Sequence, residues 1–407
     1  MITVEEYHRS MLDRVAPLPV RRVPVGEAHG LRLAEDVHAA LAVPPFDNSA
    51  MDGFGVRAAD VAAATADRPV LLPVGGDVPA GTTEPSAVMP GTAVRVMTGA
   101  PVPPGADAVV PVELTDQPPG AAGLPTHVAV REPVAAGRHI RRRGEDVRPG
   151  DLVVQAGTVL QATHLSAATA AGHGTLSVHP RPRVGVLATG DELVPPGVEP
   201  GPGRSPDSNS VLLAALVREA GATPVPLGTV GDDPADLRDV VAAALADLDL
   251  LVTSGGVSVG TKDVVKAAFS DRLDFVTVAM QPGKPQGFGV LADRVPVLAL
   301  PGNPVSVMVS FHVHVAPVLR RLADLPARPP LETARAGVGW RCPPRRRQYL
   351  PVVVEDDGAA VPSVRPASSG GSGSHLVASL ALAEALAVVP EDVDAVAPGD
   401  EVGLLRW

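Results

Sequence analysis

The clearest indication of the fold is Leu248-Asp249-Leu250-Leu251-Val252-Thr253, which runs directly into Ser254-Gly255-Gly256-Val257-Ser258-Val259-Gly260. The first part is a short apolar run of aliphatic and β-branched side chains, which is typical of a buried strand. The second part is a glycine-rich loop whose backbone N–H groups are suited to bind an anion. It lacks the Gly-Lys-Ser/Thr ending of a P-loop and does not match the dinucleotide fingerprint. A tight strand-to-helix turn and an anion-binding loop are therefore both open interpretations.

The segments on either side continue the same alternation of strand and helix over residues 181–322. Further strands are predicted at Val184–Leu187, Val225–Val230, Phe275–Val278 and Val297–Leu300. Helices are predicted at Leu212–Val217, Asp233–Leu245, Val264–Phe269 and Val305–Leu322. Strands that alternate with helices of this length predict a doubly wound parallel sheet, and hence an α/β domain.

Three of the predicted strands end in loops of distinctive composition. The loops are Thr189-Gly190-Asp191-Glu192, Ser254–Gly260 and Pro301-Gly302-Asn303-Pro304. Because ligands bind beyond the carboxyl ends of the strands in such a sheet, we expect the three loops to form one crevice. Asp263 follows the second loop, and Asp191, Glu192 and Asp263 are suited to hold Mg²⁺ against substrate phosphates. Helix capping is the alternative role for Asp263.

The lysines are confined to one short segment. Lys262, Lys266 and Lys284 are the only lysines in a chain with 34 lysines and arginines in total. A lysine in so arginine-rich a chain indicates a position where a compact ammonium is required. Lys284 lies between two prolines, Pro282 and Pro285, and we predict that it is a fixed charge for an anionic group.

Most of the remaining chain is predicted to be β-structure. Thr3 and Glu6 form the capping-box pattern of one N-terminal helix. Short strands are predicted at Val94–Met97, Val109–Val112, Val128–Val130, Val352–Val354 and Ala385–Val389. We expect four domains: an N-terminal region of residues 1–40 and 140–180, a β-rich insertion of 41–139, the α/β domain of 181–325, and a β-barrel-like C-terminal domain of 330–407.

Composition excludes several classes of protein. The net charge of −11 argues against nucleic acid and anionic membranes as partners. Cys342 is the only cysteine, so neither an intramolecular disulfide nor a cysteine-based metal site is possible. No signal peptide and no apolar run long enough for a membrane span is recognisable. We therefore expect a soluble, cytoplasmic protein.

The β-rich half contains two polar clusters. Pro45–Phe54 includes Asp47 and Asp52 beside two large apolar side chains, which would anchor the loop against a core. Residues 138–148 contain five arginines, interrupted by Gly144-Glu145-Asp146. Such a cluster is either a solvated face paired with nearby acids or an oxyanion site. Composition alone favours the solvated face.

Six motifs resemble, in their order along the chain, those of the MoeA-type molybdopterin molybdenumtransferases, the family that includes the C-terminal domain of gephyrin. They are Pro45–Gly53, Met97–Pro101, Arg141–Asp146, Thr189–Leu193, Ser254–Gly260 with Asp263, and Leu300–Pro304. The resemblance covers nearly the whole chain. It implies an elongated homodimer of four-domain subunits with an active site shared between subunits. It also implies Mg²⁺-dependent insertion of molybdate into adenylylated molybdopterin with release of AMP, the last step of molybdenum cofactor assembly.

The resemblance also implies roles for individual residues. Asp52, Asp263 and Lys284 are expected to be catalytic, and Asp191, Glu192 and Asp233 to hold the metal, with Asp232 as the alternative to Asp233. The expected substrate-binding residues are Thr98, Arg142, Asp146, Thr189, Ser254, Gly255, Gly256, Ser258, Gly260, Pro301 and Pro304. The arginine cluster thereby becomes a substrate-binding element, and other proteins of the molybdopterin pathway become expected transfer partners.

Three residues depart from the pattern of the family. Phe54 replaces a frequent tyrosine, so a hydroxyl role at that position is lost. Gln281 replaces a frequent lysine and reduces the positive charge beside Lys284. Pro351 falls near the place of a frequent arginine, which argues against cation contacts from the C-terminal domain.

Two other functions stay open. A molybdopterin adenylyltransferase would resemble residues 181–322 alone, and the clusters at Asp52 and Arg141–Asp146 argue against it. A gephyrin-like scaffold without activity is the second alternative, which the retained acids and lysines disfavour.

Overall fold

The computed structural model describes residues 1–407 except 121–122, 258–262, 328–329, 356–357, 359 and 369–376. The chain forms two compact units. The major unit consists of Met1–Arg21 and His179–Trp407, and the inserted unit of Arg22–Val178. Among the described residues, no helix is both long and apolar enough to cross a membrane.

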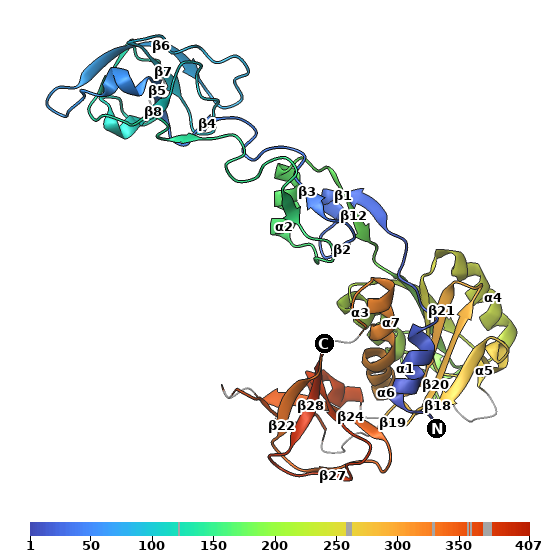
Figure 1. Ribbon diagram of the computed structural model, residues 1–407. Coiled ribbons are helices and arrows are strands. Elements are labelled where there is room, and N and C mark those ends of the chain that lie inside the picture. The colour runs from blue at the N-terminus through green and yellow to red at the C-terminus, as the bar shows by residue number, and fades with distance from the viewer. Residues whose placement is uncertain (121–122, 258–262, 328–329, 356–357, 359, 369–376) are drawn as a thin grey trace. The chain divides into compact units, whose positions relative to one another are not determined.

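The major unit is built around a six-stranded sheet (Figure 1). Its strand order is β16 (Thr223–Val230), β13 (Arg183–Thr189), β17 (Leu250–Ser254), β21 (Val295–Leu300), β20 (Pro285–Leu291) and β18 (Leu273–Thr277). The first four strands are parallel to one another, which confirms the predicted parallel sheet. β20 was not predicted, and it runs antiparallel to both neighbours.

The glycines of β20 explain both why it was missed and why it fits. Gly287 and Gly289 suggest a turn in the sequence, because glycine is disfavoured within strands. In the structure, a Cβ on Gly289 would lie 2.4 Å from the carbonyl oxygen of Arg272. The strand therefore needs glycine for close approach to β18. The short connection from β20 to β21 makes their pairing antiparallel, since a parallel pair needs a long crossover.

Helices cover both faces of the sheet, as expected for a doubly wound domain (Figure 1). One core contains α1 (Val4–Leu12), α3 (Ser208–Glu219), α6 (Pro304–Ser310) and α7 (Ala316–Leu322). The other contains α4 (Pro234–Ala244) and α5 (Val264–Phe269). Leu250 and Val252 belong to the first core and Leu251 to the second, because successive side chains of a strand alternate between faces.

One predicted helix is confirmed in detail, and another differs from its prediction. α1 has the predicted capping box, in which Thr3 Oγ1 accepts from the backbone N–H of Glu6 and the Glu6 carboxylate accepts from that of Thr3. The predicted helix Val305–Leu322 is instead α6 and α7 joined by a π-helical segment, Phe311–Val315. Such segments shift the side chains of a helix by one position and often accompany functional sites.

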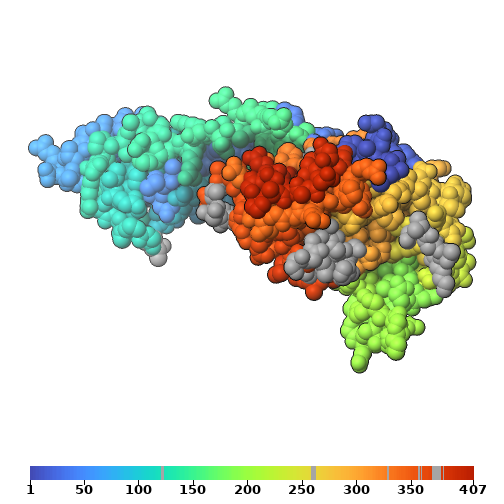
Figure 2. Space-filling view, turned by 90° about the horizontal axis from the view of Figure 1, so that it is seen from below, coloured from blue at the N-terminus to red at the C-terminus, as the bar shows by residue number. Residues whose placement is uncertain are grey.

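The C-terminal residues form a small barrel within the major unit, as predicted. The barrel strands are β22 (Glu332–Ala336), β24 (Arg347–Glu355), β25 (Ser363–Pro366), β26 (Ala385–Val389) and β28 (Glu401–Arg406). Pairing of β24 with both β25 and β26 closes the barrel. β19 (Met280–Gln281) pairs in parallel with β24 and thereby joins the barrel to the α/β part. Figure 2 shows the barrel, in orange and red, packed against that part.

The inserted unit contains a five-stranded sheet and a smaller three-stranded one. The larger sheet has the order β8 (Ala108–Pro111), β5 (Gly53–Val56), β7 (Ala93–Val96), β6 (Val70–Val78) and β9 (His127–Val130). The smaller has the order β1 (Arg21–Pro24), β12 (Thr175–His179) and β2 (Arg32–Leu33), and α2 (Ala162–Ala170) packs in the same core. The three strands predicted in this unit are β7, β8 and β9, each shifted by no more than one residue at either end.

Candidate active site

The loops after β13, β17 and β21 line one crevice of about 560 Å³, as the topology predicts. A fourth segment, Gln281–Pro285, lines it as well. Thr189, Ser254, Gly255, Gly256, Glu192, Asp263, Lys284 and Pro301 are the predicted site residues found on its wall. The loops meet because parallel strands end at the same edge of the sheet.

Close backbone contacts hold the three loops together. The Gly255 N–H donates to the Leu300 carbonyl at 3.0 Å, and the Thr189 hydroxyl donates to the Ser254 carbonyl at 3.4 Å. Gly255 has φ of +95°, and a Cβ there would lie 2.8 Å from both Thr189 O and Thr189 Oγ1. Only glycine fits this position, so the glycine-rich loop depends on its composition for shape.

Three buried oxygens at the crevice have no hydrogen-bond partner among the described residues: Ser254 Oγ, Asn209 Oδ1 and Asp263 Oδ2. The Asn209 amide is oriented by its Nδ2, which donates to the Gly302 carbonyl at 2.7 Å. Buried polar atoms without partners are costly, and they indicate that a ligand, an ion or water completes the site. All three are oxygens, which Mg²⁺ prefers, so the donor set fits this ion.

Asn209 was missed by the sequence analysis. It lies in the first turn of α3, where Asp207 Oδ1 accepts from the Ser210 N–H and caps the helix. The polar run Asp207-Ser208-Asn209 directly before the apolar face of this helix was the available signal.

The remaining acids predicted to hold metal are placed differently. Glu192 and Asp232 line the crevice. Asp191 Oδ1 accepts from the Asp232 N–H at 3.2 Å, and Asp233 caps α4 by accepting from the Ala235 N–H at 2.7 Å. Neither Asp191 nor Asp233 is on the wall, and in the described chain no three His, Cys, Asp or Glu residues gather as a metal cluster. Mg²⁺ characteristically uses one or two carboxylates together with substrate phosphates.

Two cationic side chains, Lys284 and Arg346, lie at or near the crevice. Lys284 is exposed on the wall of the crevice. Gln281, on the same wall, accepts a 2.8 Å hydrogen bond from Arg346, which directly precedes β24. A cation of the C-terminal region therefore reaches a residue of the wall without lining the crevice itself, and the prediction made from Pro351 stays a prediction.

Pro304, also predicted to bind substrate, is not on the crevice wall. Pro304 is the first residue of α6, where proline is favoured because the N–H there needs no partner. Ser258 and Gly260, like Lys262, lie outside the described residues. Lys266 is on α5.

Asp52 and Thr98 form a second cluster, in the inserted unit. Asp52 Oδ1 accepts from the backbone N–H of Thr98 at 2.6 Å and from its hydroxyl at 2.7 Å. These two hydrogen bonds lower the pKa of Asp52 below its ordinary value, the backbone one contributing more. The next residue, Gly53, opens β5, and a Cβ there would lie 2.0 Å from the Val110 carbonyl oxygen. The pairing of β5 with β8 thus fixes the backbone directly after Asp52.

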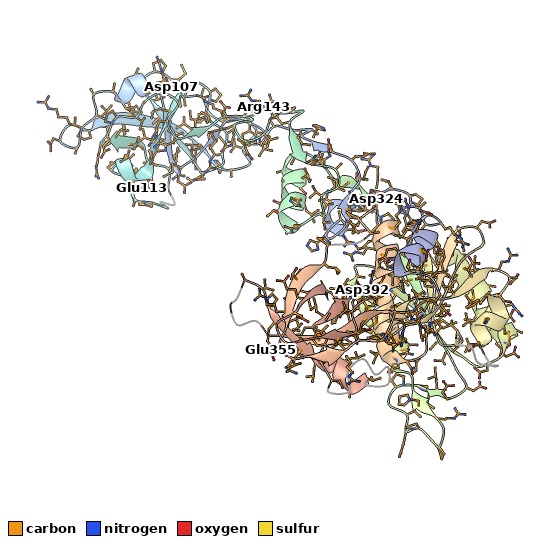
Figure 3. The ribbon with its side chains drawn as sticks, turned by 60° about the horizontal axis from the view of Figure 1, so that its bottom comes forward. Asp107, Glu113, Arg143, Asp324, Glu355 and Asp392 are labelled. Carbon is orange, nitrogen blue, oxygen red and sulfur yellow. The ribbon has the colours of Figure 1, made fainter. Side chains whose placement is uncertain are left out.

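The arginine cluster lies close to Asp47 in the same unit. Arg142 Nη1 pairs with Asp47 Oδ2 at 2.6 Å, and the backbone N–H of Arg143 donates to Asp47 Oδ1 at 2.7 Å (Figure 3 labels Arg143). These bonds lower the pKa of Asp47, the one from the Arg143 backbone most. Asp146 is exposed, and its backbone N–H donates to the Val43 carbonyl. Arg142 is thus exposed and paired with an acid, and the substrate-binding role that the resemblance implies for the cluster stays a prediction.

Comparisons with known proteins cover the chain almost completely. Residues 2–172 match the family "MoeA N-terminal region (domain I and II)", residues 185–321 match "Probable molybdopterin binding domain", and residues 333–407 match "MoeA C-terminal region (domain IV)".

Full-length relatives agree with these matches. The chain is 43% identical to molybdopterin molybdenumtransferase 2 of Mycobacterium tuberculosis over 413 residues, with 99% of this chain and 98% of the relative covered. It is 32% identical to the molybdopterin molybdenumtransferase of Haemophilus influenzae over 409 residues, with the same coverage. The crystal structure of a molybdopterin biosynthesis MoeA protein from Pyrococcus horikoshii superposes with a TM-score of 0.78 at 29% identity, covering 100% of this chain and 99% of that one. The chain therefore belongs to the MoeA family of molybdopterin molybdenumtransferases.

Proposed function

We propose that this protein inserts molybdenum into molybdopterin, using Mg²⁺ and molybdate on adenylylated molybdopterin and releasing AMP. The observation that supports this most is a set of three buried oxygens, on Ser254, Asn209 and Asp263, which have no partner in the described part of the chain. They belong to residues that line the same crevice as the exposed Lys284. Such a crevice offers hard oxygen ligands and a cation together, which is what a metal-bound phosphate anhydride requires.

In this proposal the crevice binds the phosphate part of the substrate. The loop would offer the backbone N–H of Gly256, since that of Gly255 is bonded to the Leu300 carbonyl, and Asp263, Glu192 or Asp232 would hold Mg²⁺. When bound, Mg²⁺ would withdraw negative charge from the phosphate oxygens. Lys284 stabilises the charge that develops on the leaving phosphate as the anhydride is cleaved. Measuring the Mg²⁺ affinity of Glu192 and Asp263 single variants decides which of the two carboxylates is the main ligand.

Asp52 and Thr98 supply the second part of the proposed site. The two hydrogen bonds from Thr98 keep Asp52 ionised and fix its orientation. We propose that the protein acts as a homodimer in which Asp52 of one copy and Asp263 of the other serve the same substrate. The arginines at Arg142 and Arg143 add positive charge for a polyanion on the same side.

The test is a reaction of the purified protein with Mg²⁺, molybdate and adenylylated molybdopterin. AMP release that depends on molybdate, together with transfer of active cofactor to an apo-molybdoenzyme, is the expected result. If the protein instead consumes ATP when it is given molybdopterin alone, it is an adenylyltransferase. If neither reaction occurs, it is a scaffold.

The shared site has its own test. Asp52→Ala and Asp263→Ala subunits, each inactive alone, should recover activity when mixed and allowed to exchange, since some dimers then contain one intact site. Failure of exchange-competent mixtures to recover activity would contradict the shared site but leave the proposed reaction in place.

A further inference from the structure

Lys284 lies on the turn that connects β19 to β20, and this turn sets where its charge can lie. A lysine ammonium is carried on a flexible four-carbon stem. The Lys284 side chain is exposed, so a packed core does not hold this stem. The position of the ammonium at the crevice wall therefore depends on how firmly the backbone at Lys284 is fixed.

A buried glutamine holds this turn. Gln286 is 1% exposed, and its Nε2 donates to the Gly283 carbonyl and to Ser310 Oγ, each at 2.7 Å. Since a carbonyl can only accept, the bond to Gly283 fixes which side of the amide faces the turn. The Lys284 carbonyl accepts from the Val278 N–H at 2.8 Å. Hydrogen bonds therefore fix the peptide groups on both sides of the Lys284 Cα.

The second acceptor of the glutamine connects the turn to α6. Ser310 is the last residue of this helix, and Ser306, one turn earlier, lines the crevice. Gly283 has φ of +93°, and a Cβ there would lie 2.8 Å from Ser310 Oγ. The turn thus lies directly against the helix, and only glycine fits there. The amide of Gln286 therefore joins the Lys284 turn to a helix of the crevice wall.

The demands of folding do not explain a glutamine at this position. Phe288, two residues further along β20, belongs to the core that contains α6, and side chains two apart in a strand share a face. An apolar side chain is therefore expected at Gln286. Its Oε1 is buried without a partner among the described residues, which lowers stability. The two hydrogen bonds from its Nε2 are the remaining reason for the glutamine.

We infer that Gln286 is a positioning residue for Lys284, which holds the lysine turn against α6 so that the ammonium stays at the crevice wall. Gln286 does not line the crevice, so it acts through Lys284. The inference rests on the proposed function, in which Lys284 stabilises charge on the leaving phosphate. A displacement of about 1 Å in such a group can lower the rate roughly 10²-fold.

The sequence allows this turn to be observed by itself. Of the three lysines, only Lys284 follows a glycine. In protein labelled with ¹³C at glycine carbonyls and ¹⁵N in lysine, an HNCO spectrum contains a single signal, which joins the Gly283 carbonyl to the Lys284 N–H. Gln286→Met has a side chain of similar length that donates no hydrogen bond, so the carbonyl signal should move to lower frequency. An unmoved signal overturns the inference, and the measurement needs neither substrate nor turnover.

Kinetics test whether Gln286 acts through Lys284. Gln286→Met should lower kcat for AMP release by about 10–100-fold with little change in KM, because the substrate still binds while the charge is displaced. Lys284→Ala should lower kcat by about 10²–10³-fold. In the Lys284→Ala background, Gln286→Met should cause no further loss, since the two residues form one unit. Losses that multiply independently overturn the inference.

Failure of the proposed function gives a different result. A wild-type protein that releases no AMP contradicts the proposed function, and the Gly283 signal then decides the inference alone. Val364→Ala, in the barrel core and not at the crevice, is the control for lost stability. It should melt earlier but keep kcat. A loss of kcat as large as that of Gln286→Met would mean that activity follows stability, which overturns the inference.

A second variant serves if Gln286→Met does not fold. Ser310→Ala removes the acceptor on α6 and leaves the bond from Gln286 to Gly283 in place. It should lower kcat several-fold in the wild-type background and leave kcat unchanged in the Lys284→Ala background. Wild-type kcat in Ser310→Ala, or an equal loss in both backgrounds, overturns the inference.

Discussion

The two polar clusters attributed to the active site differ in how far their hydrogen bonds are satisfied. In the crevice, Ser254, Asn209 and Asp263 each have a buried oxygen without a partner among the described residues. In the inserted unit, Asp52 is exposed and Asp47 is half-buried, and each carboxylate accepts two hydrogen bonds. The described residues thus leave acceptors of the crevice unsatisfied, whereas the carboxylates of the inserted cluster are hydrogen-bonded and present fixed charges.

This difference assigns different tasks to the two regions. Unsatisfied buried groups lower stability until something binds, so they are retained for a ligand rather than for folding. Satisfied exposed carboxylates cost little in stability and can be positioned for chemistry. We therefore expect substitutions in the crevice to alter binding and stability together, and substitutions in the inserted cluster to alter activity with little change in stability.

The largest expected effect is that of Asp52→Ala. Loss of a positioned carboxylate that acts on the reacting groups should lower kcat by about 10⁴-fold, so that turnover is abolished in practice. Thermal unfolding should be nearly unchanged, because the carboxylate is exposed and Thr98 can bond to water instead. AMP release and the melting temperature are the measurements. Asp67→Ala, an exposed acid in the same unit, is the control. Activity like that of the wild type would remove Asp52 from its role.

Asp263→Asn tests the other side of the comparison. It should lower kcat by about 10²–10³-fold, because a neutral amide holds a divalent cation poorly and charge stabilisation is lost. The free protein should become equally or more stable, since the amide carries no negative charge that burial would penalise. Mg²⁺ titration, AMP release and thermal melts measure these effects, with Asp271→Asn as the exposed control. A clear loss of stability with full activity would show that Asp263 is only a helix cap.

A smaller effect is expected in the pH profile of the Thr98→Val variant. The backbone N–H and then the hydroxyl of Thr98 lower the pKa of Asp52. Removal of the hydroxyl should raise that pKa toward its ordinary value, while the backbone bond persists. The acid limb of kcat/KM should therefore move to higher pH, by less than about one unit. An unchanged acid limb would show that Asp52 does not need to be ionised for turnover.

The sequence predicted the crevice well because each strand that leads to it is a short, continuous apolar segment. The strands before Thr189, Ser254 and Pro301 are short apolar runs, and topology alone brings the ends of parallel strands together. β20 was not predicted because its two glycines suggest a turn. The reason for them is close contact with β18, and the sequence alone does not reveal that contact.

The partners of individual side chains could not be predicted in the same way. Asp233 was predicted both as a helix start and as a metal ligand, and its carboxylate caps α4. Asn209 was not singled out, yet it lies on the crevice wall. The contact of Arg346 with Gln281 depends on the parallel pairing of β19 with β24, between segments about 65 residues apart. Spacing along the chain carries no information about such contacts.

The smallest effect concerns the arginine cluster. Arg142 and Asp47 form an ion pair at 2.6 Å, but the Arg142 side chain is 57% exposed, and water screens such pairs. Arg142→Ala should therefore change the free energy of unfolding by about 0–1 kcal/mol in urea denaturation. If the pair also serves a polyanionic substrate, the KM for adenylylated molybdopterin should rise several-fold while kcat is kept. Arg148→Ala, at an exposed arginine of the same cluster, is the control. A loss of stability well above 1 kcal/mol in Arg142→Ala would mean that the cluster is structural rather than a charged face that meets the substrate.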